Sequence, residues 1–367
     1  STNDKIEKPM PINQLNHTWI QEIRELHPQL SITKVRSFVW LMLGIYLSRS
    51  VHLSRVAGKV PGSAKLLSIT RRLSRFLDNP AVKVRQWYKP VALAWLQAQF
   101  ANLGEIRLIV DGTKVGFAHQ LLMVSLAYRR RAVPIAWTWV KHVRGHSSGY
   151  KQLSLLSYIR QLIPEGAKVI LVGDTEFGSV KVLKELNNWG WFYILRQKTD
   201  TLVLAQGSSH WKAFGDFVQK AGQSAWLENA CYTRSKKYTV NLFAYWKVGE
   251  KEPWCLATNL PDKKSVLSYY KRRVWIEEMF GDMKKHGFDL ESSMLRSFLR
   301  LSRLTLAIAF LYLWLISTGT DAIHRGKRHL VDVRSRRDLS LFQIGMRIIE
   351  RAITNASSPR LSLCFYR

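Results

Sequence analysis

The sequence predicts an α/β chain in which a mixed sheet is flanked by helical regions at both ends. Between residues 104 and 325, short β-branched runs alternate with helical patterns, as in α/β sheets. The first hundred residues show helical periodicity and turn signals without strand patterns. A hydrophobic content of 47% with 14 Trp in 367 residues excludes a disordered polycation.

Residues 1–103 are predicted to form a helical domain. A strongly apolar helix covers Ser31 to Ser48, and a second covers about Val51 to Lys59. After a Pro-Gly turn, a third helix capped by Ser63 runs to Leu77. A further helix, from Lys83 to Phe100, leads out of the region.

The third helix has one apolar face, and three arginines lie off that face: Arg71, Arg72 and Arg75. A helix, a short turn and a basic helix make the helix-turn-helix pattern, whose second helix enters a major groove. The alternative is a plain helical bundle with a solvated basic face. The charge of the chain favours DNA binding, so residues 1–103 are predicted to be a DNA-binding domain.

The central region, residues 104–325, is predicted to hold three antiparallel strands, then a helix, a strand, a helix and a strand. This order is that of a ribonuclease-H-like mixed sheet. Residues 200–264 return to β-rich composition and are predicted to be an inserted β subdomain. The tail, residues 326–367, opens with basic residues and ends in an amphipathic helix, Leu341 to Ile353. That helix is expected to bury its apolar face within the chain or against another subunit. The expected strands are 106–110, 121–126, 132–140, 168–173 and 191–195, with helices at 150–163 and 179–188.

The formal net charge is +30, from 56 Lys and Arg against 26 Asp and Glu. Repulsion among so many positive charges is tolerated most easily when the protein binds a polyanion, and nucleic acid is the first candidate. A ribosome-associated protein or a protein that binds anionic membranes is the alternative on composition alone. The basic residues are spread along the chain, which favours an extended, salt-sensitive contact surface.

Three cysteines without CxxC spacing favour neither a zinc site nor a disulfide framework, and they fit a reducing compartment. The first residues, Ser1 to Pro11, show no apolar signal segment. The most apolar run, Leu304 to Ile316, is too short to span a bilayer and is predicted to be a buried core helix. A soluble, cytoplasmic protein is expected.

The stretch from Tyr270 to Lys284 is predicted to be a helix, with Ser265 upstream as its N-cap. At about 100° per residue, Tyr270, Arg273 and Lys284 all fall within roughly 40° of Glu277. Gly281 shares that face and leaves it bare of side chain. A stripe with a carboxylate, a phenol and two cations suits a metal and a phosphate better than a core.

Two aspartates follow apolar strands: Asp111 after Ile109-Val110, and Asp174 after Leu171-Val172-Gly173. A single Asp at such a place is more often a turn or cap residue than a ligand. Together with Glu277 these two form a set of three carboxylates, which are the oxygen ligands that Mg²⁺ or Mn²⁺ prefers. Two such metals activate a nucleophile and stabilise the leaving oxygen in phosphodiester displacement.

These residues resemble a bacterial insertion-sequence DDE transposase of the branch defined by Y-x2-R-x3-E-x6-K. Tyr270, Arg273, Glu277 and Lys284 match all four positions and all three gaps. The Asp-Gly-Thr at Asp111 and the Asp-Thr-Glu at 174–176 fit the first and second acidic positions, and the branch also has a β subdomain before its catalytic Glu. The resemblance covers about residues 104–325.

The resemblance implies a ribonuclease-H-like transposase with Asp111, Asp174 and Glu277 as catalytic metal ligands for two Mg²⁺ or Mn²⁺ ions. Its partners are double-stranded DNA, as terminal inverted repeats and as target, and a second copy of the chain in a synaptic complex. It implies nicking, hairpin formation and opening, then joining of the 3′ ends to target DNA by a cytoplasmic, nucleoid-associated bacterial enzyme. Tyr270, Arg273 and Lys284 then hold phosphates beside the cleaved end.

Further residues have weaker or divided interpretations. Trp254 stands where related proteins carry a base-stacking Trp, although a core Trp is the alternative. Glu176 is either an acid supporting Asp174 or a surface residue. Glu278 is disfavoured because it lies about 100° from Glu277. The loop residues His142, Arg144 and His146 contact DNA in one interpretation and are solvated in the other.

Two rival functions remain. One is a metal-dependent nuclease of the same fold without strand transfer. The other is a catalytically silent DNA-binding protein, which three intact carboxylates disfavour. No GxxxxGK[ST] motif occurs, so ATP is not implied.

Overall fold

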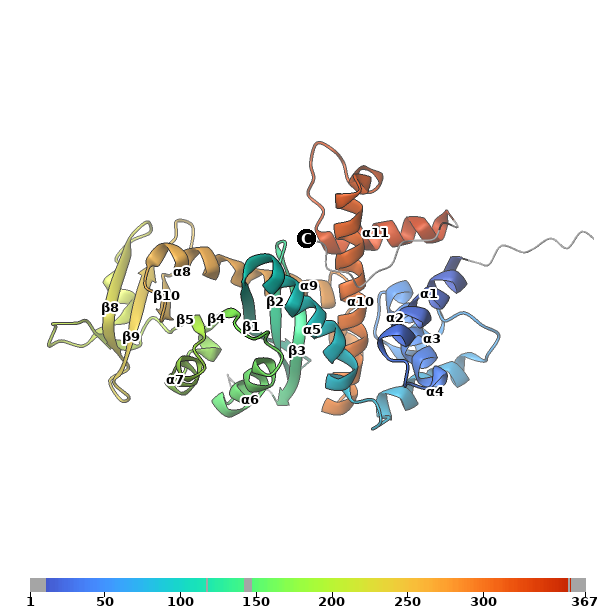
Figure 1. Cartoon of the computed structure of the whole chain (residues 1–367), viewed down its shortest axis with the longest axis horizontal. Coiled ribbons are helices and arrows are strands. Elements are labelled where there is room, and N and C mark those ends of the chain that lie inside the picture. The colour runs from blue at the N-terminus through green and yellow to red at the C-terminus, as the bar shows by residue number, and fades with distance from the viewer. Residues whose placement is uncertain (1–10, 117, 142–146, 356, 358–367) are drawn as a thin grey trace, which may run out of the picture. The chain divides into compact units, whose positions relative to one another are not determined.

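The computed structural model describes residues 11–116, 118–141, 147–355 and 357 (Figure 1). The chain divides into two compact units. We call residues 95–279 the sheet unit, and residues 1–94 together with 280–367 the helical unit. These divisions differ from the expected boundaries at 103 and 325, because α10 (Phe298–His324) packs with α2 (Ile32–Ser48), α4 (Leu66–Asp78) and α11 (Leu341–Thr354).

The sheet unit holds a mixed sheet of ten strands among the described residues, in the order β3-β2-β1-β4-β5-β10-β9-β8-β6-β7. β1 is antiparallel to β2, which is antiparallel to β3, whereas β4 is parallel to both β1 and β5. The first five strands are β1 (Glu105–Val115), β2 (His119–Tyr128), β3 (Arg131–Lys141), β4 (Lys168–Gly173) and β5 (Phe192–Arg196).

The β-rich region expected between 200 and 264 continues this same sheet. β10 pairs antiparallel with β5, with Leu256 opposite Arg196, and β9 and β8 follow outward. The remaining strands are β6 (Leu202–Leu204), β7 (Lys212–Ala213), β8 (Ser224–Tyr232), β9 (Tyr238–Tyr245) and β10 (Trp254–Thr258).

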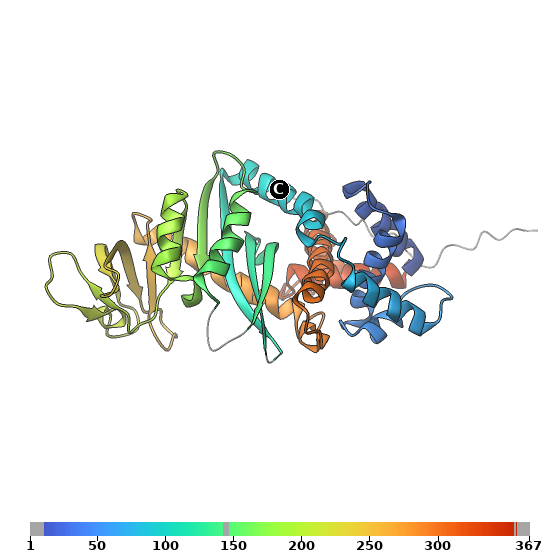
Figure 2. The ribbon, with the colours of Figure 1, turned by 90° about the horizontal axis from the view of Figure 1, so that it is seen from below.

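Helices cover both faces of the sheet. α6 (Gly149–Arg160) and α7 (Val180–Asn188) pack together on one face, while α8 (Lys263–Tyr270) packs on β4 and β5 from the other (Figures 1 and 2). Ser148 and Ser179 cap α6 and α7 by accepting backbone N–H groups three residues on.

The helical unit contains the expected N-terminal helices, but Ser63 does not cap the third one: α4 begins at Leu66 and its N-cap residue is Lys65. Its other elements are α1 (Pro11–Leu26), α3 (Leu53–Ala57) and α5 (Val84–Leu103), whose end lies in the sheet unit. α4 buries its expected apolar face, Ile69, Leu73, Phe76 and Leu77. However, residues 58–65 separate α3 from α4, which is longer than the three- or four-residue turn of a helix-turn-helix.

The three arginines of α4 do not share one environment. Arg71 and Arg75 are exposed. Arg72 instead packs on α2, where its Nε donates to Ser37 Oγ at 2.9 Å and its guanidinium lies 4.2 Å from the centre of the Trp40 ring. Arg72 therefore joins two helices, which sequence periodicity alone did not indicate.

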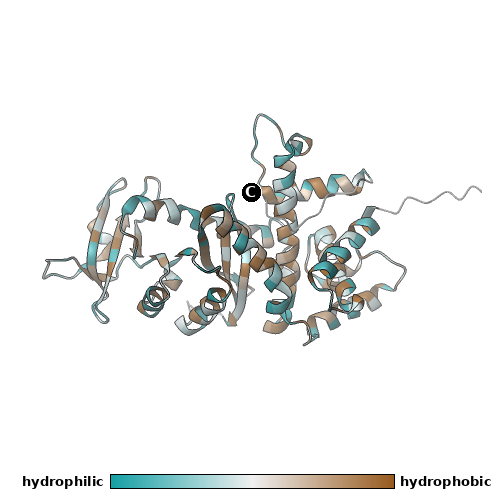
Figure 3. Cartoon of the chain, viewed as in Figure 1, coloured by the Kyte–Doolittle hydropathy of each residue, from teal (hydrophilic) through white to brown (hydrophobic). Residues whose placement is uncertain are grey.

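α10 is the core of the helical unit and is longer than the expected apolar run. By length and composition it could cross a membrane, yet 83% of its most apolar window is buried inside the structure, as in the core helix of a soluble protein. Figure 3 shows the hydrophobic residues along α10. α11 buries its apolar face against α10, so of the two expected alternatives the intramolecular one is found.

Candidate active site

The stretch from Tyr270 to Lys284 is not one regular helix. α8 ends at Tyr270, a 3₁₀ turn covers Lys271–Arg273, and α9 (Val274–Met283) follows. The expected N-cap was also wrong: Asp262 caps α8, and its carboxylate accepts the backbone N–H and the hydroxyl of Ser265. A 3₁₀ turn is more tightly wound than an α-helix, so the single stripe expected from ideal α-helical angles does not hold across the turn.

Arg273 nevertheless connects two of the three carboxylates that the sequence predicted to act together, Asp111 and Glu277. Its Nη1 lies 3.2 Å from Asp111 Oδ2, and its Nη2 donates to Glu277 Oε1 one helical turn on. The guanidinium therefore lies between an acid of β1 and an acid of α9. Charge-assisted bonds of this kind are among the stronger protein hydrogen bonds.

Asp111 lies inside β1 rather than at its end, because β1 continues to Val115 and pairs Asp111 with Met123 of β2. On the side of β1 that pairs with β4, however, Asp111 does follow the last paired residue of the strand. The parallel pairing of β1 with β4 stops at Val110 opposite Gly173, so Asp111 and Asp174 are the next residues after the last pair. The sheet register thus places the two aspartates at one edge of the parallel pairing.

Burial raises the pKa of Asp111 to about 7, while Arg273 and the Gly112 N–H lower it and Asp174 and Glu277 raise it. The Asp111 carboxylate accepts that N–H at 2.7 Å. Burial alone would lower the pKa of Arg273, but its interactions with Tyr270 and then with the three carboxylates hold that pKa above the usual range. Asp174 and Glu277 therefore both act electrostatically on Asp111.

The raised pKa of Asp111 makes the metal-free protein less stable as pH rises from about 4 to about 7. The folded state binds more protons than the unfolded state in this window, so the free energy of unfolding falls with pH. At about 1.4 kcal/mol per pH unit the full effect is on the order of 4 kcal/mol. Urea unfolding of wild-type protein and Asp111→Asn across this range tests it: the variant should lose this slope, and an identical slope in both proteins contradicts it.

Carboxylate oxygens from Asp111, Asp174 and Glu277 suit Mg²⁺ in the chemistry of their donor atoms. Within the described part of the chain, no three Asp, Glu, His or Cys side chains are already grouped closely enough to hold a metal ion. In the present arrangement the Arg273 guanidinium forms ion pairs with both Asp111 and Glu277. The donor set fits the ion, with Arg273 as the cation that now lies between two of its members.

Tyr270 is buried beside this cluster, and among the described residues its hydroxyl has no hydrogen-bond partner. Its pKa is raised above the usual range, mainly by burial. The Trp254 ring packs edge-on at 5.2 Å from the Tyr270 ring, and Lys247 Nζ lies 5.7 Å from the Trp254 ring. Trp254 is only half-buried. A buried hydroxyl without a partner is costly, which points to a ligand atom there.

Glu176 follows Asp174 in a 3₁₀ turn (Thr175–Phe177) and is bonded on both oxygens. Oε2 accepts Gln120 Nε2 at 2.8 Å, and Oε1 accepts the backbone N–H of Ser147 at 2.7 Å and its hydroxyl. Gln152 donates to the Glu176 carbonyl at 3.0 Å. Glu176 therefore ties β2 and the start of α6 to the end of β4.

Sequence reasoning missed these partners of Glu176, and it missed Arg196. A usable signal existed for the glutamines, because Gln120 and Gln152 are polar residues at buried positions of a strand and a helix. Arg196 ends β5, parallel to β4, and its charge acts on Tyr270. Its ion pair with Glu252, at 2.7 Å, depends on tertiary structure alone.

The other expected site residues have diverse settings. Glu278 lies 3.6 Å from Arg131, whereas Glu277 pairs with Arg273. Lys284 and Gly281 belong to the helical unit, where Lys284 pairs with Glu291 at 3.0 Å. A Cβ on Gly281 would lie 3.1 Å from His286 Nδ1. The imidazole ring of His286 therefore borders the side-chain-free surface that the sequence predicted at Gly281. His142, Arg144 and His146 lie outside the described residues.

Residues 103–314 match the family described as the transposase DDE domain, which is more than half of the 367-residue chain. The chain belongs to the transposase DDE domain family. A search of curated proteins found no match. Among solved structures, a piggyBac transposase synaptic complex with hairpin DNA is similar at a TM-score of 0.42 and 8% identity, covering 96% of this chain and 80% of that one. A TM-score this low does not establish a shared fold.

The transposase DDE match contains the carboxylates Asp111, Asp174 and Glu277 together with Tyr270 and Arg273. It ends within α10, so the basic residues of α4 and those that follow α10 lie outside it. The family match and the geometry therefore concern the same part of the chain.

Proposed function

We propose that this transposase-family chain is a Mg²⁺-dependent DNA transposase that cuts DNA at terminal inverted repeats and joins the freed 3′ ends to target DNA. The observation that carries the proposal is the pairing of one guanidinium, that of Arg273, with both Asp111 and Glu277, while Asp174 follows the last β1–β4 pair as Asp111 does. The strand order β3-β2-β1-β4-β5, antiparallel then parallel, supports a ribonuclease-H-like arrangement. The four-residue signature supports the bacterial insertion-sequence branch.

Asp111, Asp174 and Glu277 would hold the divalent ions, and Mn²⁺ has similar ligand preferences. When bound, such ions activate the attacking oxygen and stabilise the leaving oxygen of a phosphodiester. Arg273, which is paired with the carboxylates in this structure, would move toward a phosphate of the DNA. The Tyr270 hydroxyl, which has no partner among the described residues, would donate to the same phosphate.

DNA is the partner that the net charge of +30 favours, and the exposed Arg71 and Arg75 of α4 are proposed to contact its backbone. Arg72 is proposed to orient α4 through its contacts with α2. A second copy of the chain in a synaptic complex and a cytoplasmic, nucleoid-associated location complete the proposal. Lys284 is proposed to reach a DNA phosphate when its pairing with Glu291 opens.

Trp254 is proposed to stack a base that leaves the duplex during hairpin formation, because it is half-buried and packs on Tyr270. Trp254→Ala is expected to lower hairpin yield roughly ten-fold while nicking is largely retained, since stacking is worth about 1–3 kcal/mol per base. Denaturing gels measure both products. Trp226→Ala, which removes a half-buried Trp of β8, is the control, and equal hairpin yields in the two variants would remove this role.

The experiment that tests the function combines purified protein, Mg²⁺, DNA from both flanks of the gene, and a target plasmid. Joined products that disappear in Asp174→Asn and Glu277→Gln support a transposase. Cleavage without joining favours the nuclease of the same fold. DNA binding without any cleavage favours the silent DNA-binding protein and rejects both enzymes.

A further inference from the structure

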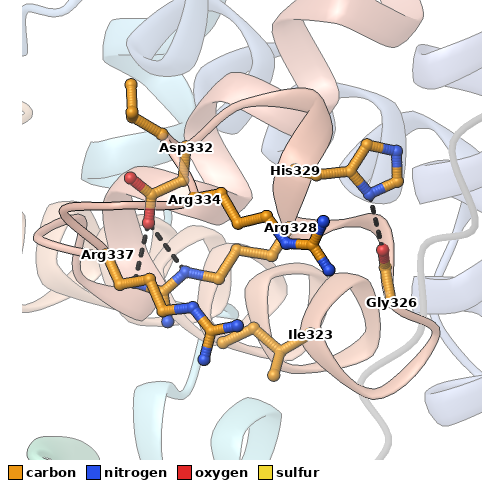
Figure 4. Close-up of a pocket in the computed structure, with 8 residues that line it drawn as sticks. Ile323, Gly326, Arg328, His329, Asp332, Arg334 and Arg337 are labelled. Carbon is orange, nitrogen blue, oxygen red and sulfur yellow. Dashed lines mark hydrogen bonds and ion pairs between the residues drawn. The ribbon is translucent and has the colours of Figure 1, made fainter.

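A basic pocket follows α10 in the helical unit, outside the family match. It has a volume of about 650 Å³ and is formed by eight residues: Ile323, Gly326, Arg328, His329, Asp332, Val333, Arg334 and Arg337. Figure 4 shows these side chains around the hollow. Three arginines and a histidine meet a single acid there, so the lining carries a clear positive excess.

The single acid is already neutralised. Asp332 is buried, and its Oδ2 accepts both Nε and Nη2 of Arg328 at 2.7 Å (Figure 4). Hydrogen bonds between two charged groups of this kind are stronger than those between neutral groups. The pair holds Arg328 and Asp332 in place and leaves the charge of the other two arginines uncompensated.

Arg334 and Arg337 are exposed, and within the described residues neither lies within ion-pair distance of an acid. Nearby bonds order the segment that carries them: His329 Nδ1 donates to the Gly326 carbonyl at 2.7 Å, and Arg347 donates to the Val331 carbonyl at 3.1 Å. Val333, 60% exposed, adds an apolar surface at the rim. The pocket thus combines two free guanidinium groups with a small apolar contact.

We propose that this pocket binds the sugar-phosphate backbone of duplex DNA, with Arg334 and Arg337 on phosphate oxygens and Val333 against a deoxyribose. Guanidinium groups bind phosphate oxygens well because their donors match the geometry of the anion. The proposal rests on the proposed function, since it supplies the DNA. It adds a contact site that is separate from the carboxylates and from α4.

The test compares Arg334→Gln/Arg337→Gln with the wild-type protein and with Arg336→Gln, which removes one positive charge, half of that lost in the double variant, from an exposed arginine of the segment outside the pocket lining. Glutamine keeps an unbranched stem, which suits the left-handed backbone of Arg337 as well as arginine does. Fluorescence anisotropy follows binding of a labelled duplex of about three helical turns at several salt concentrations. Circular dichroism confirms that each variant is folded.

The double variant is expected to bind about ten-fold more weakly at roughly 0.1 M salt. The slope of log affinity against log salt concentration is expected to be shallower by about two. Binding releases about one counterion fewer for each phosphate contact that is lost. The effect of Arg336→Gln on the affinity and on the salt slope should each be less than half of the effect of the double variant. A double variant that matches Arg336→Gln overturns the proposal.

A second arm separates DNA from free phosphate. If inorganic phosphate raises the melting temperature of the wild type but not of the double variant, while the two bind DNA equally, the pocket serves a free anion and the proposal is overturned. If the wild type binds no duplex at all, the proposed function fails with it. If the wild type binds and joins DNA but the double variant binds equally well, only the pocket proposal fails.

Discussion

The Asp111→Asn substitution is expected to lower DNA strand cleavage by at least about 10³-fold. Loss of a group that only supports a metal ligand typically costs 10- to 100-fold, and loss of a ligand costs more. Asparagine keeps the shape of the side chain and can still accept the Gly112 N–H, but it presents an amide donor toward Arg273. Single-turnover cleavage of a labelled duplex in Mg²⁺ measures the change.

The matched control is Asp200→Asn, which removes the same charge from an exposed aspartate of the sheet unit. It should cleave at the wild-type rate. Asparagine is neutral and keeps the shape of the buried Asp111 side chain, so the substitution should leave the fold intact. An unfolding curve checks this. A folded Asp111→Asn protein that cleaves within ten-fold of the wild type would remove Asp111 from the catalytic centre.

Gly345→Ala is expected to destabilise the helical unit by more than about 3 kcal/mol, the upper end for overpacking in a core. A Cβ at Gly345 would lie 1.9 Å from the backbone carbonyl of Leu315, and a Cβ at Gly319 would lie 2.1 Å from that of Leu341. Backbone meets backbone where α10 and α11 cross, so no side chain can move aside. Urea unfolding followed by circular dichroism measures the loss.

Gly58→Ala provides the comparison, because a Cβ there meets only ordinary contacts from 3.5 Å outward. That variant should unfold near the wild-type midpoint. Equal midpoints for Gly58→Ala and Gly345→Ala would show that α11 does not pack on α10 in this way.

The local pattern of apolar residues in the sequence predicted much of the sheet unit. The runs of Ile, Val and Leu predicted β1 to β5, and the aspartates that follow two of these runs predicted one edge of the sheet. Asp111 was placed correctly relative to β4 and incorrectly relative to β2, because an apolar run reveals where a strand starts more clearly than where antiparallel pairing stops. The role of Arg273 as a bridge between Asp111 and Glu277 needed the three-dimensional structure.

The helical unit was harder to predict from sequence. α10 joins helices from both ends of the chain, and such long-range packing leaves little mark on local periodicity. The 3₁₀ turn at Lys271–Arg273 likewise interrupts a stretch whose residues all tolerate an α-helix. Gly319 and Gly345 in α10 and α11 are the local signal of a close helix crossing.

We propose that Asp111, Asp174 and Glu277 act as one metal-binding set. Titration with Mn²⁺, followed by electron paramagnetic resonance of the free ion, tests this most directly. We expect wild-type protein to bind Mn²⁺ more tightly as pH rises toward about 7, because the ion competes with the proton on Asp111. Binding should be lost in Asp111→Asn, Asp174→Asn and Glu277→Gln and kept in Asp200→Asn. Equal Mn²⁺ binding by all four variants and the wild type would contradict the claim.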